Sequence, residues 1–424
     1  MNRRLTTPLK GCRDFYPSSQ VFQNWLSQKA AEACRLFGYQ EYEGPILEPF
    51  SLYAAKSSEE IIKKQSFLVP QKSKGKLPFV LRPELTPTLA RMVANREYDL
   101  VFPLRWWSWG RFFRYEKPQK GRGREFFQWN VDILGENSPN ADAEVIALGC
   151  YFLASLGFSS KDVVVKINDR KYLDSKFSLI GLDKNKTKAL YRIIDKKGKV
   201  NQVDFDAMLA EEGLDKLQIK DLQLALKDDD YSRESDWLTE LFSSLTDLGV
   251  ADWVEFDPII VRGFDYYTDT VFEASLRKKT ARALFGGGRY QNLITNVGGK
   301  RKLGGVGFAA GDMMLEEALR QSDLYPDLLS LSAQVLVTSF DMACFRESIQ
   351  LARQLREKGV AVELFVNPKI SLTKQLDYAN KKGIKKVIIL GSDEIKQNKA
   401  TIKDMISGKQ EKVEQKDLAK ILKK

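Results

Sequence analysis

The spacing of apolar residues predicts a chain that opens with a helix and continues into a body of mixed helices and strands. Residues 18–37 (SSQVFQNWLSQKAAEACRLF) carry apolar side chains three and four positions apart, which indicates an amphipathic helix. Residues 86–97 predict a second helix with Thr86 as its N-cap, and residues 140–157 predict a third. Residues 161–168 (KDVVVKIN) have the β-branched run that is typical of a strand.

Two neighbouring segments, 106–116 and 125–135, have the aromatic and alternating composition of a β-hairpin. The residues between them, KPQKGRGR (117–124), form a basic connection. Ordinary hairpin loops have about 2–5 residues, and this one is longer. We therefore expect the loop to have a function.

Alternation with a period of two gathers polar side chains on one face of this predicted hairpin. Arg114 shares a face with Glu116. On the second strand the shared face holds Phe126, Gln128, Asn130 and Asp132. Burying such a face is costly unless it binds a ligand, whereas a polar face turned to solvent is ordinary in antiparallel sheets. The residues leave both alternatives open, and in both Trp129 packs on the opposite face.

Charged helical segments and a second set of strands follow. Residues 170–250 predict a helical insertion, and strand-like runs resume at 254–276. The cluster FGGGRY (285–290) either lets a backbone approach a ligand closely or forms a turn. Strands and helices then alternate as βαβαβ. The predicted organisation is an α+β domain over residues 1–325, which includes the insertion, and a small α/β domain over residues 333–424.

The stretch RGFDYYTDTVFE (262–273) sets an arginine and two adjacent tyrosines in a strand-like context. An arginine can form a forked pair with a carboxylate or phosphate, and a tyrosine hydroxyl can donate or accept a hydrogen bond. Strict alternation puts Arg262 and Tyr267 on opposite faces. Both reach one site only if the chain bulges or if Arg262 precedes the strand, and Gly263 would permit either.

The segment LRPELTP (81–87) places Glu84 and Thr86 near the start of the second predicted helix. Capping and compensation of the helix dipole are the simplest explanation for such residues. The alternative is a carboxylate that holds a cationic group of a ligand, such as an α-amino group.

Composition removes several kinds of chemistry. The 424 residues include no histidine, which excludes a Ser-His-Asp or Cys-His nucleophile, a His-ligated zinc and an imidazole proton shuttle. The net charge is +11, and residues 331–424 hold 19 Lys and Arg against 11 Asp and Glu. This excess favours a polyanionic partner such as nucleic acid, although a solvated Lys-rich surface is a common alternative.

The four cysteines are scattered without metal-ligand or redox spacing, which indicates reduced thiols. No window approaches 18 uncharged apolar residues, and the first residues lack the apolar core of an export signal. These features predict a cytoplasmic protein that does not associate with a membrane.

Taken together, these segments resemble histidyl-tRNA synthetase, a class II aminoacyl-tRNA synthetase, over nearly the whole chain. KGCRDFYP is similar to the family's N-terminal signature, and FGYQEYEGPILEPF and RFFRYEKPQKGRGREFFQWNVDILG are similar to the first two class II motifs. RGFDYYTDTVFE and FGGGRYQNLI resemble two histidine-specific signatures, and SLTKQLDYANKKGIKKVIILGSDE resembles the anticodon-binding domain. The resemblance implies an α+β fold with a six-stranded antiparallel catalytic sheet flanked by helices, a helical insertion and a C-terminal α/β anticodon-binding domain.

The same resemblance implies an ATP-dependent ligase that works as a homodimer, with L-histidine, ATP and tRNA(His) as partners. The histidine carboxylate attacks the α-phosphate of ATP and releases pyrophosphate, and the terminal ribose of the tRNA then takes the acyl group. Such chemistry depends on positioning and charge neutralisation more than on an acid or a base. A chain without histidine is compatible with it. Mg²⁺ is expected between the ATP phosphates, with no protein ligand assigned to it.

The resemblance also assigns roles to particular residues. Arg114 and Arg262 are the catalytic residues that it implies, both at the α-phosphate. The implied ATP site consists of Arg114, Glu116, Arg122 and Phe126. The implied histidine site consists of Glu84, Thr86, Gln128, Asp132, Arg262, Tyr266 and Tyr267. A neutral imidazole has one N–H donor and one bare nitrogen, so Asp132 is expected to accept from the first and Tyr267 to meet the second.

Three positions depart from the family pattern. GFAAGDMMLEE places Met313 and Met314 where Glu and an ATP-binding Arg are expected. Gly123 stands where the family often has tyrosine, which bears on recognition of the tRNA acceptor end. Asp132 replaces a frequent glutamate and keeps the carboxylate one methylene shorter.

Three rival functions follow from these departures and from the charge. The first is a catalytically inactive paralogue that acts as a regulatory subunit of histidine biosynthesis, which Met314 favours and the C-terminal domain opposes. The second is a class II synthetase for glycine, threonine or proline, which the tyrosine pair opposes. The third is a non-enzymatic RNA-binding protein, which only the charge supports.

Overall fold

The computed structural model describes residues 5–54, 65–72, 75–183, 186–198, 200–228, 230–262, 266–277, 283–328 and 333–423. The chain divides into two units, residues 1–327 and residues 328–424, and each is described by itself. Within the described ranges, every helix is too short or too polar to traverse a bilayer. Residues 329–332, which lie between the two predicted domains, are not described.

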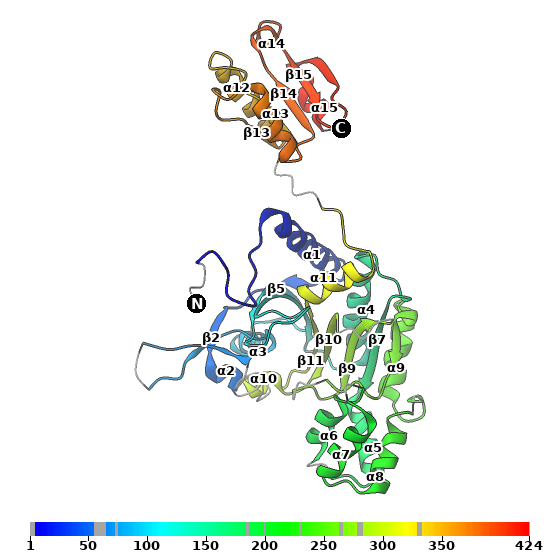
Figure 1. Ribbon diagram of the computed structural model, residues 1–424. Coiled ribbons are helices and arrows are strands. Elements are labelled where there is room, and N and C mark those ends of the chain that lie inside the picture. The colour runs from blue at the N-terminus through cyan, green and yellow to red at the C-terminus, as the bar shows by residue number, and fades with distance from the viewer. Residues whose placement is uncertain are drawn as a thin grey trace. The chain divides into compact units, whose positions relative to one another are not determined.

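The first unit is organised around an eight-stranded sheet in the order β1-β5-β6-β11-β10-β9-β7-β8 (Figure 1). In that order the strands are Gln40–Glu41, Leu104–Phe113, Glu125–Leu134, Gly305–Gly311, Phe285–Tyr290, Thr270–Leu276, Val163–Asp169 and Val254–Phe256. The six strands from β5 to β7 are antiparallel to their neighbours. Short β1 and β8 pair in parallel at the two edges. The expectation of a six-stranded antiparallel sheet is confirmed, with one added strand at each edge.

Strand β6 shows how alternation separates the core from the candidate site. Trp129, Val131 and Ile133 are fully buried, and the Trp129 ring lies 4.4 Å from that of Phe152 on the helix behind the sheet. The alternate polar residues Gln128, Asn130 and Asp132 are also buried, with exposed fractions of 8%, 4% and 5%. The alternative of a solvent-exposed polar face is therefore wrong, and this face needs polar partners.

A layer of helices covers the apolar face of the sheet. The helix α4 (Pro139–Ser155) packs against β6, β10 and β11, and both α1 (Pro17–Leu36) and α9 (Asp236–Asp247) pack against α4. A Cβ at Gly149 of α4 would lie 2.7 Å from the Phe285 ring, so this glycine allows the helix to approach the sheet closely.

The predicted insertion is helical, but its last helix belongs to the main layer. Its elements are α5 (Arg170–Leu179), α6 (Thr187–Ile194), α7 (Gln202–Glu211), α8 (Lys216–Ala225) and α9. Helices α5 to α8 gather together below the sheet in Figure 1, whereas α9 packs against α4. Local caps explain where two of these helices begin. The Asn201 side chain accepts from the N–H of Asp204, and Asp215 forms a reciprocal capping box with Gln218.

Smaller elements complete the first unit. They are β2 (Leu47–Pro49), α2 (Phe50–Ala54), β3 (Phe67–Val69), β4 (Phe79–Leu81), α3 (Thr86–Asn95), a 3₁₀ turn at Ala251–Trp253, α10 (Leu293–Asn296) and α11 (Asp312–Gln321). Strands β2, β4 and β3 form a separate three-stranded sheet.

Two local predictions were wrong. Helix α3 begins at Thr86 with Leu85 as its N-cap, and no side chain caps it. The first hairpin strand ends at Phe113 rather than 116, so Arg114 and Glu116 lie in the connection. The strand-like runs expected within 254–276 are confirmed as β8 and β9. FGGGRY is the central strand β10, so of its two alternatives the turn is wrong.

The second unit contains the predicted βαβαβ arrangement. Its elements are β12 (Val335–Val337), α12 (Phe345–Glu357), β13 (Val362–Leu364), α13 (Leu372–Lys381), β14 (Lys386–Ile389), α14 (Ser392–Lys396), β15 (Lys399–Asp404), β16 (Gln410–Glu414), a 3₁₀ turn at Gln415–Asp417 and α15 (Leu418–Leu422). Strands β13, β12 and β14 are parallel, and the unpredicted strands β15 and β16 extend the sheet in antiparallel fashion. Buried Val335, Val337 and Ile388 belong to its core.

Candidate active site

Two adjoining cavities open on the polar face of the large sheet. The smaller, of about 100 Å³, is lined by Glu84, Thr86, Arg114, Gln128, Asp132, Arg262, Tyr266 and Tyr267, among others. The larger, of about 750 Å³, is lined by Arg114, Glu116, Arg122, Phe126, Gln128 and Arg262, among others. The structure therefore brings together all eleven residues proposed from the sequence, and it places Arg114, Gln128 and Arg262 where the cavities meet.

Glu84 presents a buried carboxylate to the smaller cavity. Its exposed fraction is 4%, and the Tyr266 hydroxyl donates to its Oε2 at 3.1 Å. The Tyr53 hydroxyl donates to the Glu84 carbonyl at 3.0 Å and holds the turn before α3. The Arg114 side chain is fixed at the same turn, because its Nε donates to the carbonyl of Pro83 at 2.9 Å. A carboxylate and a guanidinium thus lie on two sides of one small space.

Asp132 has a strongly perturbed carboxyl. Burial raises its pKa to about 7, and the hydrogen bond that it accepts from the Tyr290 hydroxyl at 2.8 Å opposes that rise. Gly307 on the neighbouring strand leaves room for the carboxylate, because a Cβ there would overlap Asp132. Burial also raises the pKa of Tyr267 to about 12, so its hydroxyl stays protonated at neutral pH. Asp132 thus offers the cavity a carboxylate acceptor, and Tyr267 offers it a neutral hydroxyl.

Arg262 precedes strand β9, which resolves the difficulty that alternation raised. Its backbone has φ of 55°, an uncommon conformation for a residue with a side chain. Its guanidinium pairs with Glu273 and lies over Gly286 of β10, where a Cβ would come within 2.5 Å of it. A Cβ at Gly288 would lie 2.8 Å from the Tyr267 ring. The glycines of FGGGRY thus make room for site side chains. Gly263 lies outside the described residues.

Arg170, which the sequence did not single out, holds the segment that carries Arg262 and Tyr267. Its guanidinium donates to the carbonyls of Val261 at 2.8 Å, Arg262 at 2.9 Å and Tyr267 at 2.6 Å. The Arg170 side chain is buried at the start of α5, and the Tyr191 hydroxyl of α6 donates to its carbonyl at 3.0 Å. The helical insertion is therefore tied directly to the backbone of the candidate site.

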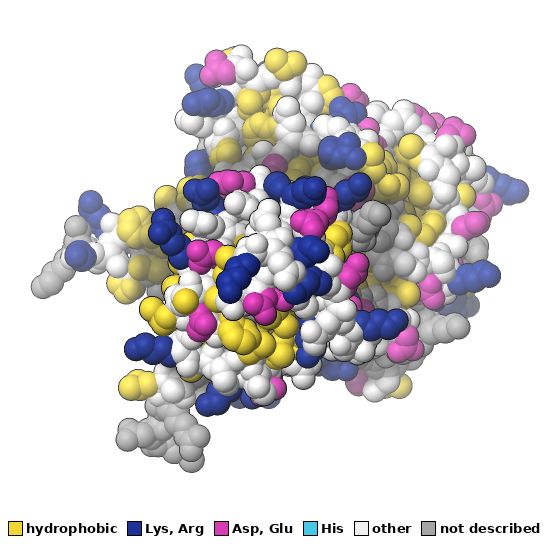
Figure 2. Space-filling model, turned by 90° about the horizontal axis from the view of Figure 1, so that it is seen from above, with side chains coloured by type: hydrophobic (Ala, Val, Ile, Leu, Met, Phe, Trp, Pro, Cys, Tyr) yellow, Lys and Arg dark blue, Asp and Glu magenta, His cyan; other side chains and the backbone are white. Residues whose placement is uncertain are grey.

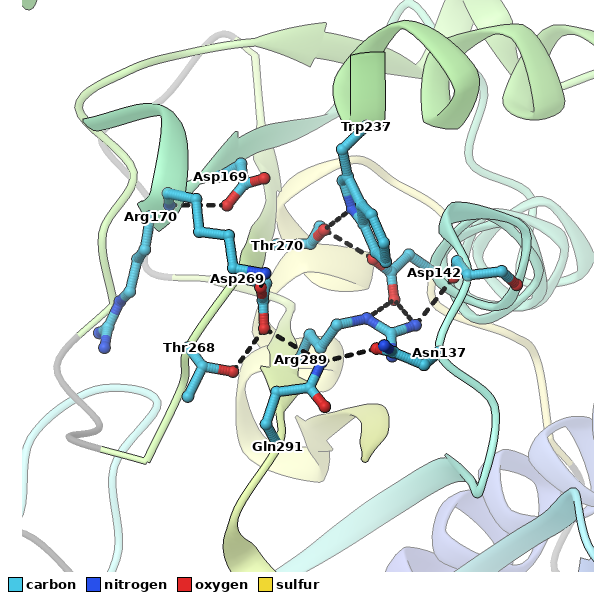
Figure 3. A network of polar contacts seen from close by, with 12 residues as sticks. Asn137, Asp142, Asp169, Arg170, Trp237, Thr268, Asp269, Thr270, Arg289 and Gln291 are labelled. Atoms are coloured by element: carbon cyan, nitrogen blue, oxygen red, sulfur yellow. Dashed lines mark hydrogen bonds and ion pairs between the residues drawn. The ribbon is translucent and has the colours of Figure 1, made fainter. Parts of the chain in front are cut away.

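A second unpredicted network joins the strands beneath the site (Figure 3). Arg289 of β10 and Asp142 of α4 form an ion pair at 2.6 Å, and neither side chain is exposed. The Thr270 hydroxyl donates to Asp142 at 2.6 Å, and the indole N–H of Trp237 donates to Thr270 at 2.9 Å. Burial raises the pKa of Asp142 although the arginine opposes it. This network connects β9, β10, α4 and α9.

The loop between β5 and β6 closes one side of the larger cavity. Arg122 pairs with Glu116 at 2.7 Å. The Gly123 backbone packs against the N-terminal segment, where a Cβ would lie 2.9 Å from the Gly11 carbonyl. The same carbonyl accepts from the N–H of Arg124 at 2.6 Å. A residue larger than glycine at position 123 would displace this contact, which gives the departure at Gly123 a packing reason.

The two methionines of the third motif lie against the same loop. A Cβ at Gly121 would overlap the Met314 sulfur, and one at Gly123 would lie 3.0 Å from the Met313 sulfur. Both methionines line the larger cavity. Asp312 before them is fully buried and accepts from Arg13 at 2.6 Å. The start of α11 therefore gives the cavity an uncharged wall.

The carboxylates that line the larger cavity are already paired. Glu116 pairs with Arg122 and Glu273 with Arg262. Across the described ranges, no three His, Cys, Asp or Glu side chains converge as a metal site. All four cysteines are free. A hard divalent cation fits here only as the companion of a ligand's phosphates, with Glu116 and Glu273 as the nearest carboxylates.

The fold and the cavities define the catalytic unit of a class II aminoacyl-tRNA synthetase. The family model for histidyl-tRNA synthetase matches residues 11–313, and the model for an anticodon binding domain matches residues 334–424. A histidine–tRNA ligase of Leptospira biflexa is 37% identical over 423 residues, with 96% of this chain and 95% of the relative covered. The chain therefore belongs to the histidyl-tRNA synthetase family.

Solved structures are similar over both units. Histidyl-tRNA synthetase from Nostoc sp. PCC 7120 superposes with a TM-score of 0.82 at 25% identity, covering 100% of this chain and 99% of that one. A protein from Bacillus halodurans C, described as an ATP phosphoribosyltransferase regulatory subunit/histidyl-tRNA synthetase, has a TM-score of 0.70 at 25% identity. The alignment covers 86% of this chain and 93% of the Bacillus halodurans C protein.

Proposed function

We propose that this chain ligates L-histidine to tRNA(His) in two steps that use ATP and pass through histidyl-adenylate. The observation that carries the proposal is the meeting of the two cavities at Arg114 and Arg262. The smaller cavity has a buried acceptor at Asp132 and a protonated hydroxyl at Tyr267. The larger cavity has the positive charges that complement the phosphates of a nucleotide.

The smaller cavity suits the amino acid. The Asp132 carboxylate accepts the imidazole N–H, and the Tyr267 hydroxyl donates to the bare nitrogen. Glu84, Thr86 and Gln128 receive the α-amino group, and Tyr266 holds the Glu84 carboxylate in place. A site built from such partners rejects an amino acid without them by about 10⁴–10⁵, because its own polar groups would remain unpaired.

The larger cavity suits ATP. Phe126 stacks on the adenine, and Arg114, whose guanidinium lies 5.4 Å from the Phe126 ring, holds the α-phosphate. Glu116 and Arg122 serve the phosphates and the loop that covers them. Arg262 contacts both the histidine carboxylate and the α-phosphate, so it stabilises the charge that develops as one attacks the other. Mg²⁺, when bound, neutralises the departing phosphates.

The second step requires the tRNA, for which the C-terminal unit is the proposed anticodon-binding domain. We assign residues 1–325 to catalysis and residues 333–424 to the anticodon, which the matches of the two family models support. On the face shown in Figure 2, Lys and Arg side chains are interspersed with Asp and Glu and do not form one continuous patch. A cytoplasmic homodimer is the proposed working form.

Charging of a tRNA(His) transcript with labelled histidine tests this function. The expected result is ATP-dependent charging of tRNA(His) by the full chain and no charging of a tRNA for another amino acid. The regulatory-subunit alternative rests on Met314 and on the likeness to the Bacillus halodurans C protein. Folded protein that binds histidine and charges no tRNA would favour that alternative.

A further inference from the structure

The described lining of the larger cavity holds more cations than carboxylates. Its described lining includes four cations, Arg114, Arg122, Lys197 and Arg262, and two carboxylates. Both carboxylates form ion pairs, Glu116 with Arg122 and Glu273 with Arg262. Arg114 and Lys197 therefore have no ion pair among the described residues, and a polyanion is the ligand chemistry that complements them.

Lys197 enters this cavity from the helical insertion. It follows α6 and precedes Gly198, whose φ of +79° turns the chain, and it forms an isolated bridge with Val200. Its Nζ lies 5.6 Å from the centroid of the Phe205 ring, so the side chain has a fixed support. Among the described residues, no carboxylate lies within ion-pair distance of Lys197. Burial, followed by the proximity of Lys227, lowers the pKa of its ammonium group.

The same cavity lacks charge where α11 begins. Met313 and Met314 line it, and their sulfur atoms rest on the loop glycines 123 and 121. No described cation therefore reaches the nucleotide from this wall. A tail of β- and γ-phosphates in the cavity needs charge from another element, and Lys197 is the cation that the insertion supplies. A lysine ammonium serves as a point charge for phosphate.

We propose that Lys197 binds the β- and γ-phosphates of ATP and supplies the positive charge that the methionines of α11 do not. This proposal rests on the function proposed above and adds a nucleotide-binding role for the insertion. Lys197 then acts on the affinity for ATP and pyrophosphate, and not on the recognition of histidine, since it lines only the larger of the two cavities.

The test measures pyrophosphate exchange into ATP by the full chain carrying Lys197→Met, which keeps the apolar stem and removes the charge. The KM for ATP is expected to rise about 10- to 100-fold, the size of one charged contact to phosphate, while the KM for histidine stays within about twofold. Lys197→Arg keeps the charge and is expected to stay within about threefold of wild type. Lys196→Met is the matched control, because the neighbouring Lys196 is exposed and lines neither cavity.

Three results would overturn the proposal. They are an unchanged KM for ATP in Lys197→Met, an equal rise in the KM for histidine, and the same loss in Lys196→Met. Failure of the underlying function is a different observation, because the wild-type protein would then show no histidine-dependent exchange. Thermal unfolding of each variant accompanies the kinetics, and Lys197→Gln, which also removes the charge and is expected to raise the KM for ATP by the same factor, decides the matter if the methionine variant does not fold.

Discussion

The smaller cavity is built mainly from the sheet and the turns fixed to it, whereas the larger cavity depends on loops and on the insertion. In the smaller one, Asp132, Glu84 and Tyr267 are nearly fully buried and have hydrogen-bonded neighbours. In the larger one, a loop closes one side, and two methionines stand where charge was expected. A small neutral ring is therefore recognised by hydrogen-bond partners at fixed positions. Recognition of a polyphosphate requires charge, which several elements can supply.

The largest effect is expected at the junction of the two cavities. Arg262→Ala removes the guanidinium that contacts both reacting groups, so kcat for histidine-dependent pyrophosphate exchange should fall about 10²- to 10³-fold. Exchange kinetics at saturating ATP and histidine measure this fall. Near-UV circular dichroism like that of wild type serves as the control for folding. An Arg262→Ala protein with undiminished exchange would show that Arg262 does not contact the reacting groups.

The next effect is expected within the smaller cavity. Asp132→Asn replaces the acceptor by an amide that presents a donor, so kcat/KM for histidine should fall about 10²-fold while the KM for ATP changes little. Steady-state exchange with each substrate varied in turn measures kcat/KM for histidine and the KM for ATP separately. An equal loss in both parameters would show that the two cavities do not divide the substrates as proposed.

A smaller loss is expected where glycine makes room for arginine. Gly286→Ala would bring a Cβ within 2.5 Å of the Arg262 guanidinium, so exchange should fall about 10- to 50-fold as the arginine shifts. Gly311→Ala on the next strand is the matched substitution, because Gly311 also lines the larger cavity but a Cβ there meets nothing within 4 Å. Similar losses in both variants would mean that the close approach at Gly286 has no special importance.

The smallest effect concerns pH. Ionised Asp132 is the required acceptor, and its pKa is about 7 in the free protein, so kcat/KM for histidine should rise with pH through that value. Tyr290→Phe removes the hydrogen bond that lowers this pKa, so the rise should move to higher pH. The loss should be about 3- to 10-fold at pH 6.5 and slight at pH 8.5. Titration of free histidine affects both proteins equally, so coincident profiles would contradict the role of Asp132.

Local periodicity could predict the residues that share a strand face, and it did so for Gln128 and Asp132. It could not predict Tyr290, Arg170 or the pair Asp142–Arg289, because their partners lie far away in the sequence. The resemblance to the family supplied Arg262 and Tyr267, whose segment no regular alternation describes.

The glycines of β10 left two alternatives open for a related reason. Three consecutive glycines weaken a strand locally, and only the side chains of Arg262 and Tyr267 explain why this strand needs them. Lys197 had no local signal, since a lysine among charged helices is ordinary. Its position became informative only when the cavity and its uncharged wall were seen together.

The assignment of the smaller cavity to histidine is tested by pyrophosphate exchange into ATP by the wild-type chain, with each of the twenty amino acids offered in turn. Exchange that occurs with histidine and falls by at least about 10⁴ with every other amino acid is the predicted result. Exchange that is independent of histidine, or that another amino acid supports equally well, would contradict the assignment of the smaller cavity to the imidazole ring.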